Sequence, residues 1–110
     1  MDMDTYPGKL SSNAIVLSEP HSGFVVLYAN DSKGTAFIPF IGVNRNKQGQ
    51  GVGKKLLEAC VDQSKKNGMD RIKLEVRKTN KKAIKFYESN EFIQEGESDS
   101  VSYFMVRELA

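Results

Sequence analysis

The chain has few of the residues that build metal sites and disulfide bonds. Among its 110 residues, Cys60 is the only cysteine and His21 is the only histidine. One cysteine cannot form an internal disulfide, and neither a cysteine cluster nor a histidine-rich site can be assembled to hold a metal. We therefore expect no metal in the functional site. A lone cysteine also fits a reducing compartment.

Long apolar runs are missing too. No stretch approaches the roughly 20 apolar residues of a membrane-spanning helix, and residues 1–4 are acidic or apolar in turn, without the apolar core of a signal peptide. The expected protein is soluble and cytoplasmic, with no membrane partner. Its formal net charge of +2 is too small to indicate a nucleic-acid partner.

Acidic residues are absent from residues 32–57, and this segment contains a glycine-rich stretch, Gln-Gly-Gln-Gly-Val-Gly, at 48–53. Glycine tolerates positive φ and leaves neighbouring N–H groups unshielded. A helix that starts behind such a turn adds unpaired N–H groups and the positive end of its dipole. The stretch therefore predicts a phosphate or pyrophosphate site. Basic residues surround it: Lys33, Arg45, Lys47, Lys54 and Lys55.

The length fits one domain over residues 1–110, with residues 1–12 as a flexible lead-in, and the patterns predict an α/β fold with a mixed sheet. Strands are expected at residues 13–18, 24–28, 35–43, 71–76, 92–94 and 101–107, with one helix after the glycine-rich turn and another after Asn80. The composition of 35–43 predicts burial on both faces. Pro39 interrupts this strand, which suggests a bulge or a point where a neighbouring strand diverges.

Both helices carry clear local signals. The first has an apolar stripe and a natural stop at Gly68, and the stripe makes Cys60 a core residue rather than a nucleophile. Asn80 is a candidate N-cap for the second helix. The stripe of the first helix consists of Val52, Leu56, Leu57, Cys60, Val61 and Ser64, and one face of the second consists of Ala83, Ile84 and Tyr87, with Phe86 beside them.

Two short motifs resemble those of the Gcn5-related N-acetyltransferase (GNAT) superfamily. The pyrophosphate motif Gln/Arg-x-x-Gly-x-Gly/Ala is matched by Gln48, Gly51 and Gly53, and the motif Asn-x-x-Ala-x-x-x-Tyr by Asn80, Ala83 and Tyr87. The block Leu-Glu-Val-Arg-x-Thr-Asn at residues 74–80 looks most like the branch that acetylates the N-terminal amine of ribosomal proteins. The resemblance covers roughly residues 35–107. It implies the GNAT acyl-CoA N-acyltransferase fold, whose central sheet splays around the cofactor.

The resemblance implies acetyl-CoA as cosubstrate. The turn would hold its pyrophosphate, and the main chain around Ile41 and Val43 would bind the pantetheine arm in a channel lined by the start of the second helix. The expected cofactor-binding residues are Ile41, Val43, Gln48, Gly49, Gln50, Gly51, Val52, Gly53, Lys54, Asn80, Ala83 and Phe86.

The resemblance also implies roles for two catalytic residues. Tyr87 is the expected general acid, which protonates the leaving CoA thiolate. Glu75 is the candidate base, because the ribosomal-protein branch has a functional glutamate at the matching place. The alternative for Glu75 is a surface carboxylate that pairs with Lys73 or Arg77. Strand 35–43 contains no acid, so the base that many family members place there is unavailable.

The chain departs from the family pattern at its front. Only about a dozen residues precede Asn13, too few for the helices that usually shape the acceptor pocket, so these are reduced or absent. Three alternatives follow. The acceptor site is open and shallow, a partner subunit completes it, as in a homodimer, or the N-terminal part of the enzyme is missing from this chain. Glu91 stands where the family commonly has glycine, which predicts a strained turn. The expected function is transfer of acetyl from acetyl-CoA to a primary amine of a small molecule or a protein. The alternative is a catalytically silent CoA-binding module.

Overall fold

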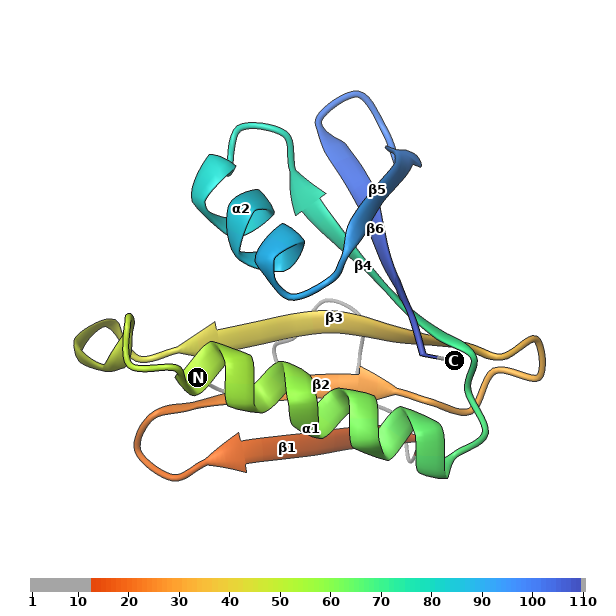
Figure 1. Ribbon diagram of the computed structural model, residues 1–110, viewed down its shortest axis with the longest axis horizontal. Helices are drawn as coiled ribbons and strands as arrows, with labels where there is room; N and C mark the ends of the chain where they lie inside the picture. Colours follow the sequence, from red (N-terminus) through yellow and green to blue (C-terminus); the bar gives the residue numbers. More distant parts are fainter. Residues whose placement is uncertain (1–12, 110) are drawn as a thin grey trace.

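The computed structural model describes residues 13–109, so the lead-in expected at residues 1–12 lies outside the described residues. The elements are β1 (Ala14–Glu19), β2 (Gly23–Tyr28), β3 (Thr35–Val43), the 3-10 turn η2 (Arg45–Lys47), α1 (Val52–Lys66), β4 (Arg71–Arg77), α2 (Lys81–Ser89), β5 (Ile93–Glu97) and β6 (Ser102–Glu108). Within the described residues, the predicted order of strands and helices is confirmed. The strands form one mixed sheet in the order β1-β2-β3-β4-β6-β5 (Figure 1).

The sheet divides into two halves at Pro39. The parallel pairing of β3 with β4 runs only from Thr35 to Ile38, opposite Arg71 to Leu74. Beyond it, β3 stays paired with β2 and β4 stays paired with β6, and the two strands diverge (Figure 1). Pro39 has no N–H to continue a ladder, so the divergence expected at this residue is confirmed.

The burial predicted for β3 is wrong. Of its side chains only Ala36 and Ile38 are buried, and the remainder of the strand is half-buried. Both buried residues lie in the part that pairs with β4. Once β4 leaves, one flank of β3 loses its neighbour, and this flank borders the cavity described below.

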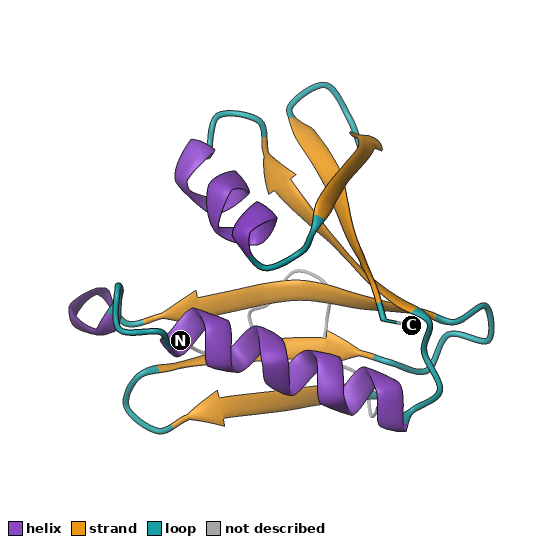
Figure 2. Ribbon diagram, in the orientation of Figure 1, coloured by secondary structure: helices purple, strands orange, loops and turns teal. Residues whose placement is uncertain are grey.

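Helix α1 crosses the β1–β3 half of the sheet, and α2 lies near the other half (Figure 2). Both helices and the sheet share one hydrophobic cluster. The predicted stripe of α1 is confirmed, since Leu56, Leu57, Cys60, Val61 and Ser64 are buried while Val52 is half-buried. Gly68 follows the helix with φ 80°, as a helix stop requires.

Helix α2 begins after Asn80, as expected. The side chain of Asn80 accepts a hydrogen bond from the N–H of Ala83 at 3.2 Å, which confirms the N-cap. The helix ends at Ser89, and Glu91 then adopts φ 72°. This turn lets Phe92 fold back into the core, where it is 2% exposed. The strain predicted at Glu91 is confirmed.

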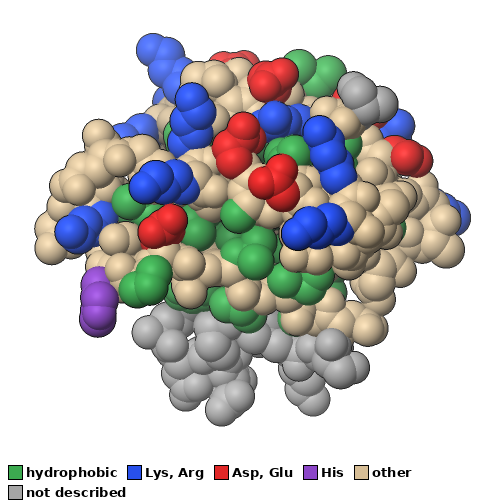
Figure 3. Space-filling view, turned by 60° about the horizontal axis from the view of Figure 1, so that its bottom comes forward, with side chains coloured by type: hydrophobic (Ala, Val, Ile, Leu, Met, Phe, Trp, Pro, Cys, Tyr) green, Lys and Arg blue, Asp and Glu red, His purple; other side chains and the backbone are tan. Residues whose placement is uncertain are grey.

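The outer surface along β1 is mixed in character. Figure 3 shows apolar side chains across the middle of this face, with acidic and basic side chains interspersed above them. Val16 of β1 is 50% exposed. Within the described residues, no helix is both long and apolar enough to cross a membrane.

Candidate functional site

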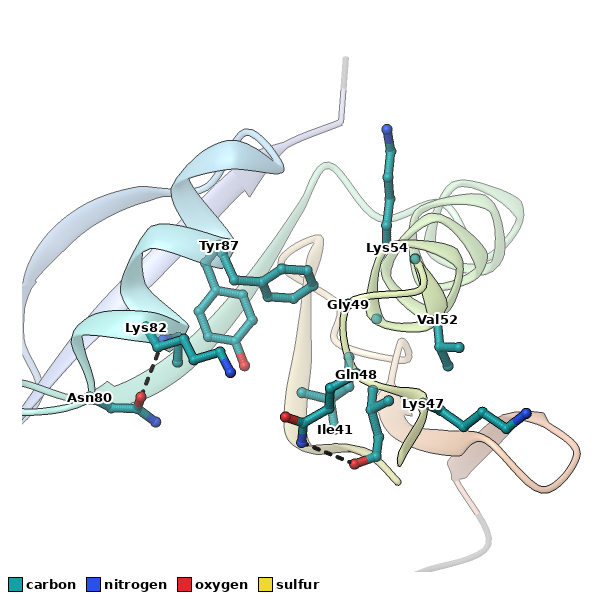
Figure 4. Close-up of a pocket in the computed structure, with 14 residues that line it drawn as sticks. Ile41, Lys47, Gln48, Gly49, Val52, Lys54, Asn80, Lys82 and Tyr87 are labelled. Carbon is teal, nitrogen blue, oxygen red and sulfur yellow. Dashed lines mark hydrogen bonds between the residues drawn. The ribbon is translucent and has the colours of Figure 1, made fainter. Parts of the chain in front are cut away.

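A cavity of about 660 Å³ lies where the two halves of the sheet diverge. Its walls come from the end of β3, the glycine-rich turn, the first turn of α1 and the cavity-facing side of α2 (Figure 4). The lining residues are Ile41, Val43, Lys47, Gln48, Gly49, Gly51, Val52, Gly53, Lys54, Asn80, Lys82, Ala83, Phe86 and Tyr87.

The cavity brings together most of the residues that were predicted to bind the cofactor, and also Tyr87. Gln50 and Glu75 do not line it. The side chain of Gln50 turns back and donates to the carbonyl of Asn46 at 3.2 Å. Two lining residues, Lys47 and Lys82, were not among the predicted ones. The acid-free segment 32–57 could have pointed to Lys47, whereas nothing in the sequence separates Lys82 from its lysine neighbours.

The three glycines of the turn favour the absence of a side chain for two different reasons. Gly49 and Gly51 have φ of 81° and 82°, and a Cβ at either would meet nothing within 4 Å. At these positions the backbone conformation favours glycine. At Gly53 a Cβ would lie 2.9 Å from Cζ of Phe86, so the end of that ring would have to shift. The start of α1 can therefore lie directly against α2.

The start of α1 has backbone N–H groups that no side chain caps. Its N-cap is Gly51, which provides no side-chain hydrogen bond to the first N–H groups of the helix. These donors and the positive end of the dipole face the cavity. The Gln48 amide donates to the carbonyl of Val43 at 3.4 Å and ties the turn to the end of β3 (Figure 4).

The charged side chains of the cavity have one sign. Three lysines line it, Lys47, Lys54 and Lys82, and no acidic residue of the described chain does. Among residues 13–109 none of the three forms an ion pair. This differs from the mixed charges of the face in Figure 3. The arrangement suits a ligand with several negative charges.

The Tyr87 hydroxyl points into the cavity from α2 (Figure 4). The ring is 9% exposed and packs between Phe86 and Phe92, with centroid distances of 5.5 and 5.8 Å. Burial raises the pKa of the phenol above its ordinary value of 10.0. The hydroxyl therefore keeps its proton at neutral pH and can donate it.

Glu75 lies outside the cavity, on the face of β4 opposite Leu74 and Val76. Its carboxylate accepts a hydrogen bond from Ser98 Oγ at 2.8 Å. Lys73 forms its ion pair with Glu95 instead, at 3.1 Å. Among residues 13–109, the pairing of Glu75 with Lys73 or Arg77 that we considered does not form. The Ser98 contact, made through the β5–β6 turn, had no signal in the sequence.

The matches to known proteins agree with this geometry. A model of the acetyltransferase (GNAT) family matches residues 15–92, which include the end of β3, the glycine-rich turn and both helices. This chain belongs to the GNAT family. No curated protein sequence matches it.

Several solved structures have the fold of this GNAT chain. Ard1 from Thermoplasma volcanium is 30% identical over 81% of this chain and 64% of that chain, with a TM-score of 0.71. A Bacillus anthracis protein in complex with acetyl coenzyme A is 28% identical over 98% of this chain and 68% of that chain, with a TM-score of 0.78. The ribosomal-protein-S18-alanine N-acetyltransferase from Escherichia coli, at 24% identity over 92% and 72% of the two chains and a TM-score of 0.73, is similar in fold. The chain thus spans less than two thirds of the length of Ard1.

Cys60 is not a candidate nucleophile in this GNAT domain. It is fully buried in the α1 stripe, and burial raises its pKa to about 12. The reactive thiolate is therefore scarce near neutral pH. The described residues also contain no group of three or more His, Cys, Asp or Glu side chains that could hold a metal ion.

Proposed function

We propose that this GNAT chain transfers the acetyl group of acetyl-CoA directly to a primary amine. One observation carries the proposal: the glycine-rich turn and the Asn80–Tyr87 segment, which are separate in the sequence, line the same cavity at the divergence of β3 and β4. The first can hold a diphosphate, and the second presents a buried, protonated hydroxyl. An acyl donor attached to a diphosphate-bearing carrier needs both.

Acetyl-CoA fits the residues that line the cavity. Its pyrophosphate would lie against the N–H groups of residues 49–53 at the start of α1. Its pantetheine arm would run along the flank of β3 that β4 leaves, beside the main chain around Ile41 and Val43. Asn80, Ala83 and Phe86 would form the opposite wall. The complex of the Bacillus anthracis protein with acetyl coenzyme A supports this choice of ligand.

The chain supplies few groups for the reaction, and the chemistry needs few. An uncharged amine attacks the thioester carbonyl, and N–H groups near Val43 would stabilise the charge that develops on the carbonyl oxygen. Tyr87 would donate its proton to the sulfur as the C–S bond breaks. Glu75 remains our candidate to receive the amine's proton. Because it lies outside the cavity, it would act through water or from the side on which the acceptor approaches.

The acceptor class is a primary amine of a small molecule or of a protein. We propose an open acceptor site, which a second subunit of a homodimer would complete. We place the protein in the cytoplasm, with neither a metal nor nucleic acid involved. A second candidate is a catalytically silent CoA-binding module, which the position of Glu75 outside the cavity favours.

Two measurements test the proposal. Thermal unfolding with acetyl-CoA, ATP or NAD tests the ligand, and we expect acetyl-CoA alone to raise the midpoint clearly. Stabilisation by ATP and not by acetyl-CoA would exclude both CoA-dependent functions. Release of free thiol with a panel of amines and peptides then tests turnover.

The variant for the turnover assay is Tyr87→Phe, with Tyr103→Phe as the matched control because Tyr103 lies on β6 and does not line the cavity. We expect Tyr87→Phe to lower the rate by roughly 10²–10⁴-fold, the contribution of a general acid, with acetyl-CoA affinity kept. Turnover equal to wild type would exclude Tyr87 as the acid. Binding without turnover of any amine would favour the silent module.

A further inference from the structure

Arg107 is a nearly buried cation for which the proposed chemistry has no use. It lies opposite Ile72 in the pairing of β6 with β4, so its side chain shares the side of the sheet on which the helices pack. This side chain is only 12% exposed. A guanidinium in such a place destabilises the fold unless its donors find acceptors. The contacts of Arg107 therefore show what keeps it there.

The Arg107 guanidinium joins α1 to the C-terminal end of α2. Its Nη1 donates to Oε2 of Glu58 on α1 at 3.2 Å and to the carbonyl of Asn90, the C-cap of α2, at 3.1 Å. Its Nη2 lies 3.4 Å from Oε2 of Glu91. The last turn of α2 has no basic residue of its own. Arg107 therefore supplies from β6 the positive charge that the C-terminal end of a helix favours.

Asn90 extends this contact to the part of α2 that lines the cavity. The Asn90 side chain and backbone are 9% exposed together. Its N–H donates to the carbonyl of Tyr87 at 3.0 Å, and its Nδ2 donates to the carbonyl of Phe86 at 2.9 Å. Tyr87 and Phe86 both line the cavity. Two hydrogen bonds in series thus connect Arg107 to the backbone that carries the proposed general acid.

The place of Arg107 in the sheet suits an anchor for α2. Its partner Ile72 lies within the stretch where β3 and β4 are still paired, whereas the cavity lies where the two strands have diverged. Arg107 itself does not line the cavity. It can therefore fix the distance between the end of α2 and α1 without occupying the space that the ligands need.

We propose that Arg107 is a positioning residue for the acetyl transfer: it fixes the end of α2 against Glu58 of α1 and thereby places the Tyr87 hydroxyl beside the thioester. This inference rests on the proposed function, since it assumes that Tyr87 donates the proton to the leaving sulfur. Proton transfer needs the two heavy atoms at hydrogen-bond distance. A displacement of about 1 Å can lower the rate on the order of 10²-fold.

Thiol release at steady state tests the inference in Arg107→Gln, Arg107→Lys and the matched control Arg71→Gln. Arg71 lies on the neighbouring strand, and its ion-pair partner is Glu108 of β6. We expect Arg107→Gln to lower kcat by roughly 10- to 100-fold, with the KM for acetyl-CoA nearly unchanged because the glycine-rich turn is intact. Arg107→Lys keeps the charge without the planar fork and should recover part of the rate. Arg71→Gln should match the wild type.

A double variant shows whether Arg107 acts through Tyr87. In Tyr87→Phe the hydroxyl is gone, so adding Arg107→Gln should lower kcat little further. If Arg107 only stabilised the fold, the two losses would multiply, and that result would overturn the inference.

Glu58→Ala keeps the inference testable if the Arg107 variants fold poorly. The Glu58 side chain is 50% exposed, and alanine favours the helix, so this variant should fold like the wild type. We expect kcat to fall by a smaller factor than in Arg107→Gln, because Arg107 keeps the carbonyl of Asn90. The control is Asp62→Ala, on the same helix and without an ion pair among residues 13–109. Equal rates in the two variants would contradict the role of the Glu58 contact.

The remaining outcomes separate this inference from the proposed function. A wild-type kcat in Arg107→Gln, with Tyr87→Phe still slow, would overturn the inference and leave the proposed function intact. A wild-type kcat in Tyr87→Phe would remove the general acid and the inference with it. Absence of turnover by the wild type with every amine would overturn the inference and the proposed function together.

Discussion

The ring of Phe86 lies directly on the backbone of Gly53, so that a Cβ at position 53 would be 2.9 Å from Cζ of the ring. This contact joins the first turn of α1 to α2 across the cavity wall. Phe86 is half-buried, and its ring also packs on Tyr87, with ring centroids 5.5 Å apart. The shape of the proposed pantetheine channel therefore depends on a glycine in one helix and an aromatic ring in the other.

Replacing this glycine should displace the ring. We expect Gly53→Ala to weaken acetyl-CoA binding, because the end of the Phe86 ring moves into the cavity or away from Tyr87. Its effect on stability should be small, since alanine favours the helix by about 1 kcal/mol over glycine and this offsets the displacement of the ring. Chemical denaturation and calorimetric titration measure the two effects. The double variant Gly53→Ala/Phe86→Leu shortens the side chain at the point of contact and should recover part of the lost affinity. Additive losses of affinity in the double variant would contradict the assigned contact.

Gly51 allows a test of charge with two substitutions of matched shape. Its φ of 82° strains any residue other than glycine, but Asp and Asn both tolerate this conformation better than most, so the two variants should lose stability to a similar extent. We expect Gly51→Asp to fold and to lose acetyl-CoA affinity, because its carboxylate would face the pyrophosphate. Gly51→Asn, which has nearly the same shape without the charge, is the control. Calorimetry should show a much smaller loss for Asn; equal losses would mean that charge is not the cause.

The raised pKa of Tyr87 predicts the alkaline side of the pH–rate profile. A phenol whose pKa lies above 10.0 keeps its proton as pH rises to that value, so the general acid stays protonated. Thiol release measured from pH 7 to 10 with a fixed amine should therefore show no decline assignable to Tyr87. A decline in rate below pH 9 that disappears in Tyr87→Phe would show that the phenol loses its proton below its ordinary pKa. Burial would then not raise the pKa of Tyr87 as expected.

Local chemistry made much of this fold predictable. Asn80 caps helix α2, Gly68 ends helix α1, and Pro39 marks the divergence of β3 from β4. Each of these residues acts on the backbone of its own segment or of the adjacent strand, so its effect could be predicted from the sequence. Contacts between distant segments were not predictable. Nothing near Glu75 in the sequence reveals that Ser98 donates to it. The predicted burial of β3 was wrong for a related reason. The composition of residues 35–43 does not show that β4 diverges from β3 after Ile38.

A buried hydroxyl in α1 offers a stabilising substitution. Ser64 Oγ is fully buried and is the one buried side-chain polar atom of the described residues without a hydrogen-bond partner. Such a group costs about 1–3 kcal/mol, and alanine is also the better helix former. Ser64→Ala should raise the free energy of unfolding by about 1 kcal/mol in urea titrations, with acetyl-CoA affinity unchanged. Ser89→Ala is the contrasting control and should not stabilise, because the Ser89 hydroxyl donates to the carbonyl of Phe86 at 2.8 Å.

The turn after α2 contains a second such opportunity, in which two effects compete. Glu91 has φ 72°, and this left-handed conformation costs a non-glycine residue about 1–2 kcal/mol. Its carboxylate lies 3.4 Å from Arg107, but the Glu91 side chain is 79% exposed, so this pair contributes little. Glycine adds flexibility to the unfolded chain and offsets part of the gain, by about 0.5–1 kcal/mol. Glu91→Gly should therefore stabilise the fold by a few tenths to about 1 kcal/mol in urea titrations.

The Arg107 contact can be separated from the strain by a second variant. Glu91→Gln removes the charge and leaves the strained backbone, so it should leave the free energy of unfolding nearly unchanged or slightly lower. Arg107 keeps Glu58 at 3.2 Å and the carbonyl of Asn90 at 3.1 Å in either variant. If Glu91→Gly instead destabilised the protein and Glu91→Gln did so equally, the ion pair would outweigh the strain, and the backbone explanation of this turn would be wrong.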